Sequence, residues 1–292
     1  MAVCLKFRNF AKIYSLIEDN RKFMKDKKIL CVASELMPYL PETEVSSMAF
    51  ESPKMVNGKG GQTRIFMPRF GNINERRHQL HEVIRLSGMN LVVNDFDMPL
   101  IIKVASIPKE RMQVYFIDNE EYFKRKATVT DKDGSLFADN DERAIFFAKG
   151  VIETVKKLNW APDIIHVHGW MASLLPLYLK TYYSNEPLFK DTKIITSVYS
   201  NSFEGELNNE IKKKVLFDEI AEEKLSLLEK ANYENLMKIS VDNSDAVIMG
   251  TQDVASDLEK FIEGKNIPTL EYKYPEEFSS AYEEFYMNEV LS

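Results

Sequence analysis

Four polar side chains stand where α/β proteins commonly place catalytic groups. Glu35 and Glu204 each follow a short apolar run, and His166 and His168 lie within the run PDIIHVHGW. Two carboxyls about 5–10 Å apart could serve as the acid and base of a glycosidase, but the sequence alone does not place them that close, and separate solvated carboxylates are the favoured interpretation. The two histidines face the same way on a strand, yet no third ligand is near them. Hydrogen-bonded histidines are therefore favoured over a metal site, and we expect no metal.

Aromatic residues near the same positions could form a platform on which a sugar ring stacks. They are Tyr39, Trp170, Tyr199 and Phe203. A tryptophan in an apolar run is more often part of the core, whereas Tyr199, beside a probable strand end, is the better candidate for contacting a ligand.

Apolar runs that alternate with helical patterns must position these residues. Strands are predicted in ILCVA, QTRIFMP, PDIIHVHGW, TKIITSVYS, SDAVIMG and IPTLEY, and strands in a meander or hairpins over residues 81–117. A helix is predicted at 46–57, with an interruption at Pro53, and a second one, ERAIFFAKGVIETVKKLNW, begins after Asp141 as its cap. Further helices are predicted in MASLLPLYLKTYY, over most of 206–240, in TQDVASDLEKFIEG and in PEEFSSAYEEFYMNEVL. The glycines of NGKGG precede a strand instead of following one, which indicates a turn and not a phosphate loop.

This alternation predicts one α/β domain, Rossmann-like, with a mostly parallel sheet, over residues 24–292. In such sheets ligands bind beyond the carboxyl ends of the strands. We therefore expect a site among residues 34–44, 166–171, 197–205 and 250–253.

Composition narrows the class of protein. The chain has 292 residues, 45% of them hydrophobic, and a formal net charge of −7. Nucleic-acid binding needs a dense basic surface, and no apolar run approaches the roughly 18 residues of a membrane span. We therefore expect that the protein binds no nucleic acid, no membrane and no cofactor. Two distant cysteines, Cys4 and Cys31, are typical of a cytoplasmic protein.

Residues 1–23 are a separate question. Met24 opens a polar lead into the first strand and could be the natural start of the protein. If the preceding residues are translated, Leu5, Phe10, Tyr14 and Ile17 give a weak helical stripe. This stripe predicts an N-terminal extension that docks on the body as an amphipathic helix.

Four motifs carry a resemblance to a known family. They are KILCVASELMPY…MPRFG, VYFIDNEEYF, DNDERAIFFAKG and PDIIHVHGWMASLLPLYLK. In this order, from about Lys27 to the region of Phe261, they resemble the N-terminal catalytic domain of bacterial glycogen and starch synthases. These are GT-B glucosyltransferases that transfer glucose from ADP- or UDP-glucose to an α-1,4-glucan. The resemblance implies the N-terminal half of a GT-B fold; the second domain, which supplies cations to the diphosphate, would begin near where this sequence stops.

The loop after the first strand departs from the family. In the family, a lysine, a threonine and two glycines approach the sugar nucleotide there. Pro41, Glu42, Thr43 and Glu44 stand at those positions. Proline removes a backbone donor, and two carboxylates would repel a diphosphate; at an effective dielectric near 20, like charges about 4 Å apart cost roughly 4 kcal/mol. The resemblance therefore implies that the donor site is lost.

The strand-end motif His-Asp-Trp-His departs as well. His168 and Trp170 match it, but Gly169 replaces the aspartate and Met171 replaces a histidine of the family's catalytic site. A thioether offers no proton.

Two more motifs differ in how well they match. The family's TIHN becomes residues 197–200, Ser-Val-Tyr-Ser, whereas Asp139 and Asn140 match a DN motif that could simply cap the long helix.

Three functions follow as hypotheses. The first is a degenerate family member, inactive alone, that binds α-glucan or maltooligosaccharide, with Glu35, Tyr39, Asp139, Asn140, His168, Trp170, Tyr199 and Glu204 as possible ligand contacts. The second is an active glucosyltransferase whose cleft is completed by a separate C-terminal-domain protein or a homodimer. The third is a scaffold that binds no ligand.

Overall fold

The computed structural model describes residues 24–200 and 203–292, so the predictions for residues 1–23 lie outside the described residues. The strands are β1 (Lys28–Ala33), β2 (Gln62–Pro68), β3 (His81–Glu82), β4 (Met89–Val93), β5 (Phe96–Ile107), β6 (Met112–Asp118), β7 (Ile164–His168), β8 (Lys193–Val198), β9 (Ala246–Met249) and β10 (Thr269–Leu270). The α-helices are α2 (Glu44–Gly58), α3 (Glu75–His78), α4 (Glu120–Phe123), α5 (Asn140–Leu158), α6 (Leu174–Lys180), α7 (Ile211–Leu216), α8 (Tyr233–Asp242), α9 (Ser256–Glu263) and α10 (Pro275–Glu284). The 3₁₀ segments are η1 (Trp170–Ala172), η2 (Pro187–Phe189) and η3 (Glu222–Lys230), and a π-helical turn, η4 (Phe285–Val290), continues α10.

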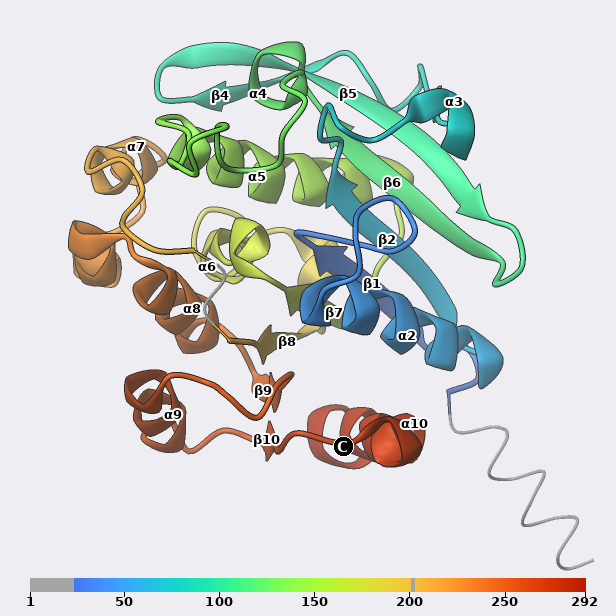
Figure 1. The fold of residues 1–292 in the computed structure, drawn as a ribbon. Helices are drawn as coiled ribbons and strands as arrows, with labels where there is room; N and C mark the ends of the chain where they lie inside the picture. The colour runs from blue at the N-terminus through green and yellow to red at the C-terminus, as the bar shows by residue number, and fades with distance from the viewer. Residues whose placement is uncertain (1–23, 201–202) are drawn as a thin grey trace, which may run out of the picture.

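One sheet runs through the molecule in the order β10-β9-β8-β7-β1-β2-β6-β5-β3 (Figure 1). Its strands are parallel from β10 to β6, whereas β5 pairs antiparallel with β6, β3 and β4. The prediction of a Rossmann-like domain with a mostly parallel sheet is confirmed. The hairpin pattern predicted within residues 81–117 corresponds to the antiparallel strands β3 to β6.

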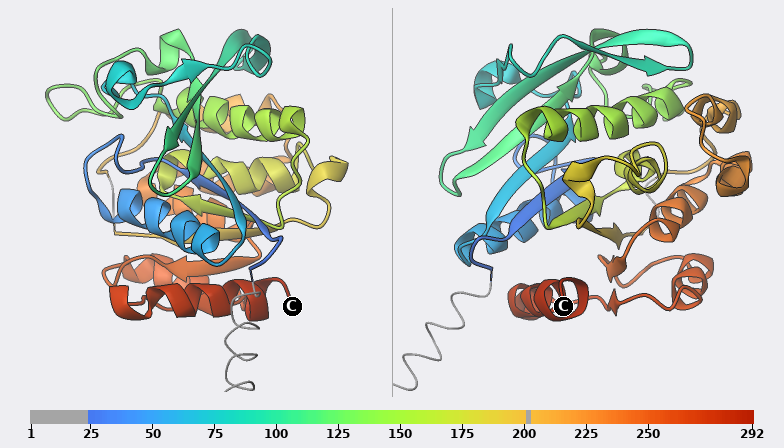
Figure 2. Two further views of the ribbon diagram at one scale, coloured as in Figure 1. Left: turned by 90° about the vertical axis from the view of Figure 1, so that its right-hand side faces the viewer. Right: turned by 180° about the vertical axis from the view of Figure 1, so that it is seen from behind.

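Helices cover both faces of this sheet, as the two views of Figure 2 show. On one face, Ile29, Ile164 and Ile195 of the strands pack against α2 and the α10–η4 segment. On the other face, the helices α5, α6 and α8 cover a larger apolar cluster. The alternating side chains of β1 and β7 therefore divide the core into two layers, as expected for strands buried on both sides.

Helix α2 continues through Pro53, so the predicted interruption is wrong. A proline inside a helix removes the hydrogen bond to the carbonyl four residues earlier, here that of Ala49. The thiol of Cys31 lies 3.6 Å from this carbonyl oxygen and donates to it. The neighbouring strand therefore satisfies the acceptor that the proline leaves free.

Two other helix predictions need correction. Helix α5 begins two residues earlier than expected, with Asp139 and not Asp141 at its N-cap position. The carboxylate of Asp141 is instead buried and bonded to Lys214 at 2.6 Å. The stretch 206–240 is broken into α7, η3 and α8, because the chain turns at Phe217–Ile220 and again at Ala231.

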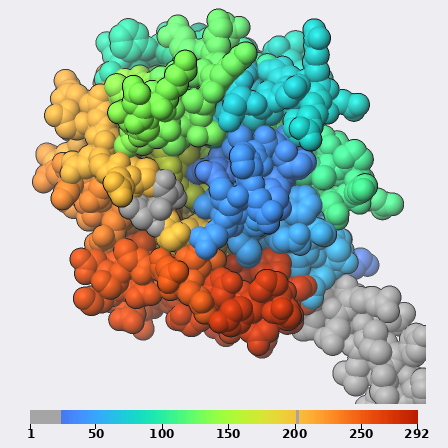
Figure 3. Space-filling view, viewed as in Figure 1, coloured from blue at the N-terminus to red at the C-terminus, as the bar shows by residue number. Residues whose placement is uncertain are grey.

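The C-terminal segment closes the lower half of one face of the sheet (Figure 1). The side chains of Phe278, Tyr282 and Tyr286 are buried there, and Lys59, the C-cap residue of α2, forms an ion pair with Glu283. In Figure 3 the red C-terminal surface lies directly against the blue surface of α2.

Candidate functional site

The N-terminus of α2 is closed by the side chains of its own first turn. Thr43 holds the N-cap position with an extended backbone at φ −136°. The N–H of Ser46 donates to Thr43 Oγ1 at 3.0 Å, and the N–H of Thr43 donates to Ser46 Oγ at 2.8 Å. A reciprocal capping box satisfies donors that a phosphate would otherwise accept from.

Carboxylates surround this capped turn. Thr43 Oγ1 donates to Glu35 at 2.6 Å, and Ser200 Oγ donates to Glu44 at 3.0 Å. Pro41, Glu42, Thr43 and Glu44 are all exposed. The helix dipole that favours an anion is therefore already matched by the protein's own negative charges.

A cavity of about 540 Å³ adjoins this turn, between α2, the end of β9 and the start of α10. Glu42, Glu44 and Glu51 line it on one side and Lys273 on another, with Tyr272 and Tyr282 as aromatic walls. Three carboxylates face one ammonium group, so the cavity is acidic on balance.

The end of β7 packs closely against the end of β1. Gly169 has φ +80°, and a Cβ placed there would lie 2.6 Å from Ser34 Oγ. Ser34 Oγ accepts the N–H of Met171 at 2.9 Å, and the side chain of Met171 is fully buried. The glycine and the methionine at these family positions are therefore part of a tightly packed junction.

His166 and His168 lie on the same face of β7, with ring centroids 3.9 Å apart, as their spacing indicates. His166 Nδ1 lies 2.6 Å from the hydroxyl of Tyr286, and its Nε2 lies 2.7 Å from Ser197 Oγ. His168 Nδ1 lies 2.7 Å from the hydroxyl of Tyr199. These are hydrogen-bonded histidines, and one partner comes from the C-terminal segment.

Both histidines are neutral at pH 7 for a physical reason. Burial lowers the pKa of His166 well below its usual range, and the neighbouring His168 lowers it further. Burial alone lowers the pKa of His168 to about 3. Burial likewise raises the pKa of Tyr199 and of Tyr286 well above the usual value. The cluster consists of uncharged donors and acceptors.

The expected aromatic platform is not a continuous exposed surface. Tyr199 and Trp170 are 1% and 4% exposed, and Tyr39 packs against His78 and Phe116. A Cβ at Gly250 would lie 2.4 Å from the ring of Tyr199, which shows how tightly this ring is held. The fourth aromatic residue, Phe203, lines a cavity.

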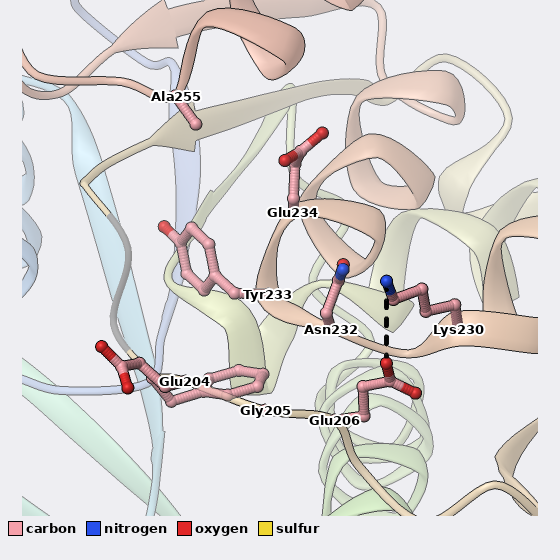
Figure 4. Close-up of a pocket in the computed structure, with 9 residues that line it drawn as sticks. Glu204, Gly205, Glu206, Lys230, Asn232, Tyr233, Glu234 and Ala255 are labelled. Atoms are coloured by element: carbon pink, nitrogen blue, oxygen red, sulfur yellow. Dashed lines mark ion pairs between the residues drawn. The ribbon is translucent and has the colours of Figure 1, made fainter.

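Glu204 lines that second cavity, between the loop after β8 and the start of α8 (Figure 4). Its volume is about 370 Å³. Glu35 lies instead at the α2 cap, where its carboxylate accepts from Thr43. The pairing of Glu35 and Glu204 as the acid and base of a glycosidase stays a prediction.

Asp139 and Asn140 hold the loop before α5. The side chain of Asp139 makes no cap hydrogen bond but pairs with Arg125 at 2.5 Å. Asn140 donates to Val129 O at 2.8 Å and accepts from the buried Arg143 at 2.6 Å. Both residues position the loop at 125–129, and Asp139 does not cap the helix through its side chain.

Sequence reasoning missed Ser34, Ser46 and Tyr286. A signal existed for Ser46, since a threonine three residues before a serine at a helix start is a cap pattern. The local sequence gives no signal for the role of Tyr286, because its hydrogen-bond partner His166 is 120 residues away.

In the part of the chain that the structure describes, no three His, Cys, Asp or Glu side chains converge on a position that could hold a metal ion. Within the same residues, no helix combines the length and the apolar composition needed to cross a bilayer.

The fold is an α/β domain whose mostly parallel sheet is covered by helices on both faces. The family model for the starch synthase catalytic domain matches residues 28–267, and the chain belongs to this family. The chain is 38% identical over 195 residues to a glycogen synthase of Chlorobium limicola, an alignment that covers 66% of this chain and 40% of that protein. For a glycogen synthase of Chlorobium luteolum the identity is 35% over 222 residues, covering 76% and 45%.

A solved structure shares the fold. It is the catalytic domain of starch synthase IV from Arabidopsis thaliana bound to ADP and acarbose, with a TM-score of 0.66, 14% identity, and coverage of 85% of this chain and 52% of that one. The chain thus spans less than half of the length of the two glycogen synthases and about half of the solved domain.

Proposed function

We propose that this glycogen/starch synthase family chain binds α-glucan and transfers no glucose by itself. The observation that carries the proposal is the closed N-terminus of α2, where Thr43 and Ser46 cap each other and Glu35 accepts from Thr43. A nucleotide diphosphate needs free donors or cations there. The chain offers carboxylates, and the N–H groups of Thr43 and Ser46 are already occupied.

The second catalytic position supports the same proposal. The side chain of Met171 is fully buried. Its backbone N–H donates to Ser34 Oγ, just after β1. A buried thioether neither transfers a proton nor donates a hydrogen bond to a sugar. The chemistry expected of a histidine at this position is therefore missing from this chain.

The test combines two assays on the pure protein. Incubation with ADP-glucose or UDP-glucose and glycogen should give no transfer, while co-sedimentation with glycogen should retain the protein in the pellet. Turnover in the ordinary range of about 1–1000 s⁻¹ would overturn the proposal. Absence from the glycogen pellet would instead favour a scaffold that binds no ligand.

A second candidate is an active glucosyltransferase whose cleft is completed by a C-terminal-domain protein or by a second copy of this chain. Three carboxylates and one lysine line the cavity beside α2, so such a partner would have to supply the cations that a diphosphate needs. Co-purification from the native host tests it: such a partner should restore transfer, and a monomer without partners would exclude this candidate.

A further inference from the structure

The cavity beside Glu204 has the size and the lining of a small binding site. It is formed by the loop that follows β8 and by the first residues of α8 (Figure 4). Its volume of about 370 Å³ is near the lower end of the usual range of ligand sites, roughly 300–1,000 Å³. It lies on the carboxyl-end side of the parallel strands, where α/β sheets bind ligands. No residue of the capped α2 turn lines it.

Its aromatic wall is fixed in place. The ring of Phe203 lies between Trp170, at 5.0 Å between centroids, and Tyr233, at 5.8 Å, with both pairs edge to face. The hydroxyl of Tyr233 donates to the carbonyl of Tyr199 at 3.1 Å. A ligand would therefore meet an ordered wall and would not have to immobilise it, which lowers the entropic cost of binding.

The backbone around the cavity is also anchored. The N–H of Leu207 donates to Ala231 O at 2.9 Å, so the loop after β8 is tied to the segment before α8. Asn232 caps α8 through a bond from the N–H of Asn235 at 2.9 Å. Gly205, with φ +87°, allows the sharp turn between Glu204 and Glu206.

The polar groups at the rim select against anions. Glu204, Glu206 and Glu234 contribute three carboxylates, and Lys230, the one cation in the lining, lies 3.9 Å from Glu206. The carboxylate of Glu204 is exposed and makes no ion pair with any described residue. Carboxylates accept strong hydrogen bonds from neutral hydroxyl groups, whereas they repel phosphate.

We propose that this cavity binds one or two glucose units of an α-glucan, with Glu204 accepting hydrogen bonds from sugar hydroxyls and the part of Phe203 that lines the cavity contacting the sugar ring. A sugar presents both C–H surface and hydroxyl donors, which matches an aromatic wall beside the carboxylate of Glu204. This inference rests on the proposed function, because it gives glucan binding a location on the chain.

Calorimetric titration of maltotriose into the wild type and into Glu204→Gln tests the assignment. The substitution keeps the shape but replaces a charge-assisted hydrogen bond with a neutral one, and we expect about five- to tenfold weaker binding. Glu223→Gln, which neutralises an exposed carboxylate of η3 outside the cavity, should bind as the wild type does. Glu42→Gln, in the other cavity, should also leave the affinity unchanged.

The outcomes separate this inference from the proposed function. Weakening in Glu204→Gln alone supports the site. Unchanged affinity in Glu204→Gln, or weakening in Glu42→Gln instead, would overturn the site while glucan binding stands. No binding of maltotriose or glycogen by the wild type would overturn both.

Discussion

Thr43 and Glu35 are joined by a hydrogen bond of 2.6 Å between the threonine hydroxyl and the carboxylate. The first strand and the helix that follows it are thereby linked at the place where the family's loop would receive a diphosphate. The side chain of Thr43 caps α2 and also donates to the carboxylate of Glu35 beside it. The contact explains in structural terms why this corner of the domain disfavours anions.

Charge reversal at this corner should create affinity for nucleotides. In Glu42→Lys/Glu44→Lys, two exposed carboxylates become cations beside the helix N-terminus, and we expect ADP to bind at least about tenfold more tightly than to the wild type, a modest gain because solvent screens exposed charges. Calorimetry with ADP measures it. The matched control is Glu120→Lys/Glu121→Lys, which changes the net charge equally at exposed positions of α4. Equal gains in both variants would show a general charge effect and contradict the account.

The C-terminal segment should contribute to stability through Tyr286. Tyr286→Phe leaves the buried Nδ1 of His166 without its partner at 2.6 Å, and an unsatisfied buried polar group costs about 1–3 kcal/mol. Urea denaturation measures the free energy of unfolding. Tyr274→Phe is the control, because that hydroxyl is bonded to Gln252 on the surface and its loss should cost less than about 0.5 kcal/mol. Equal losses would mean that the hydrogen bond to His166 contributes nothing specific.

The buried histidines should make stability fall in mild acid. Their pKa values are lowered in the folded protein, so the unfolded chain takes up protons below about pH 6.5 while the folded chain does not. Their contribution is fully present above about pH 6.5 and decreases as the pH falls, by at most about 1.4 kcal/mol per pH unit for each histidine.

Urea denaturation at several pH values between 7 and 5 gives the free energy of unfolding as a function of pH. This free energy should fall less steeply with decreasing pH in His168→Gln than in the wild type. His81→Gln serves as the control, since His81 is exposed. A slope that is the same in all three proteins would contradict the burial of neutral histidines.

Restoring a side chain at position 169 should destabilise the protein. A Cβ there would lie 2.6 Å from Ser34 Oγ and 3.2 Å from Val45 Cγ1, whereas at Gly88, whose φ of +81° is nearly the same, nothing lies within 4 Å. Both Gly169→Ala and Gly88→Ala introduce backbone strain, but only the first adds overpacking of about 1–3 kcal/mol. Thermal denaturation compares them. If the two variants are equally stable, the junction between β1 and β7 is looser than the structure shows.

The sequence predicts more of the fold than of the site. The short apolar runs at Ile29–Ala33 and Ile164–His168 predict buried parallel strands, because strands covered on both faces are continuously apolar. Pro53 misleads for a tertiary reason: the thiol of Cys31, on another element, supports the carbonyl that the proline leaves free. Local sequence contains no sign of such a contact.

The candidate site is predictable only where its chemistry is local. The capping of α2 depends on residues three apart and is readable from Thr43 and Ser46. The burial of Tyr199 and its bond to His168 depend on the packing of β7 beside β8. An exposed tyrosine and a buried one look alike in the sequence, so the aromatic platform could not be placed in advance.

The most direct measurement of the central claim is a calorimetric titration of ADP-glucose into the wild-type protein. The closed, acidic N-terminus of α2 predicts no saturable binding up to about 1 mM, the upper end of ordinary enzyme KM values. Saturable binding well below that concentration, abolished by a substitution at residues 41–44, would show that the diphosphate does bind against these side chains and would contradict the account.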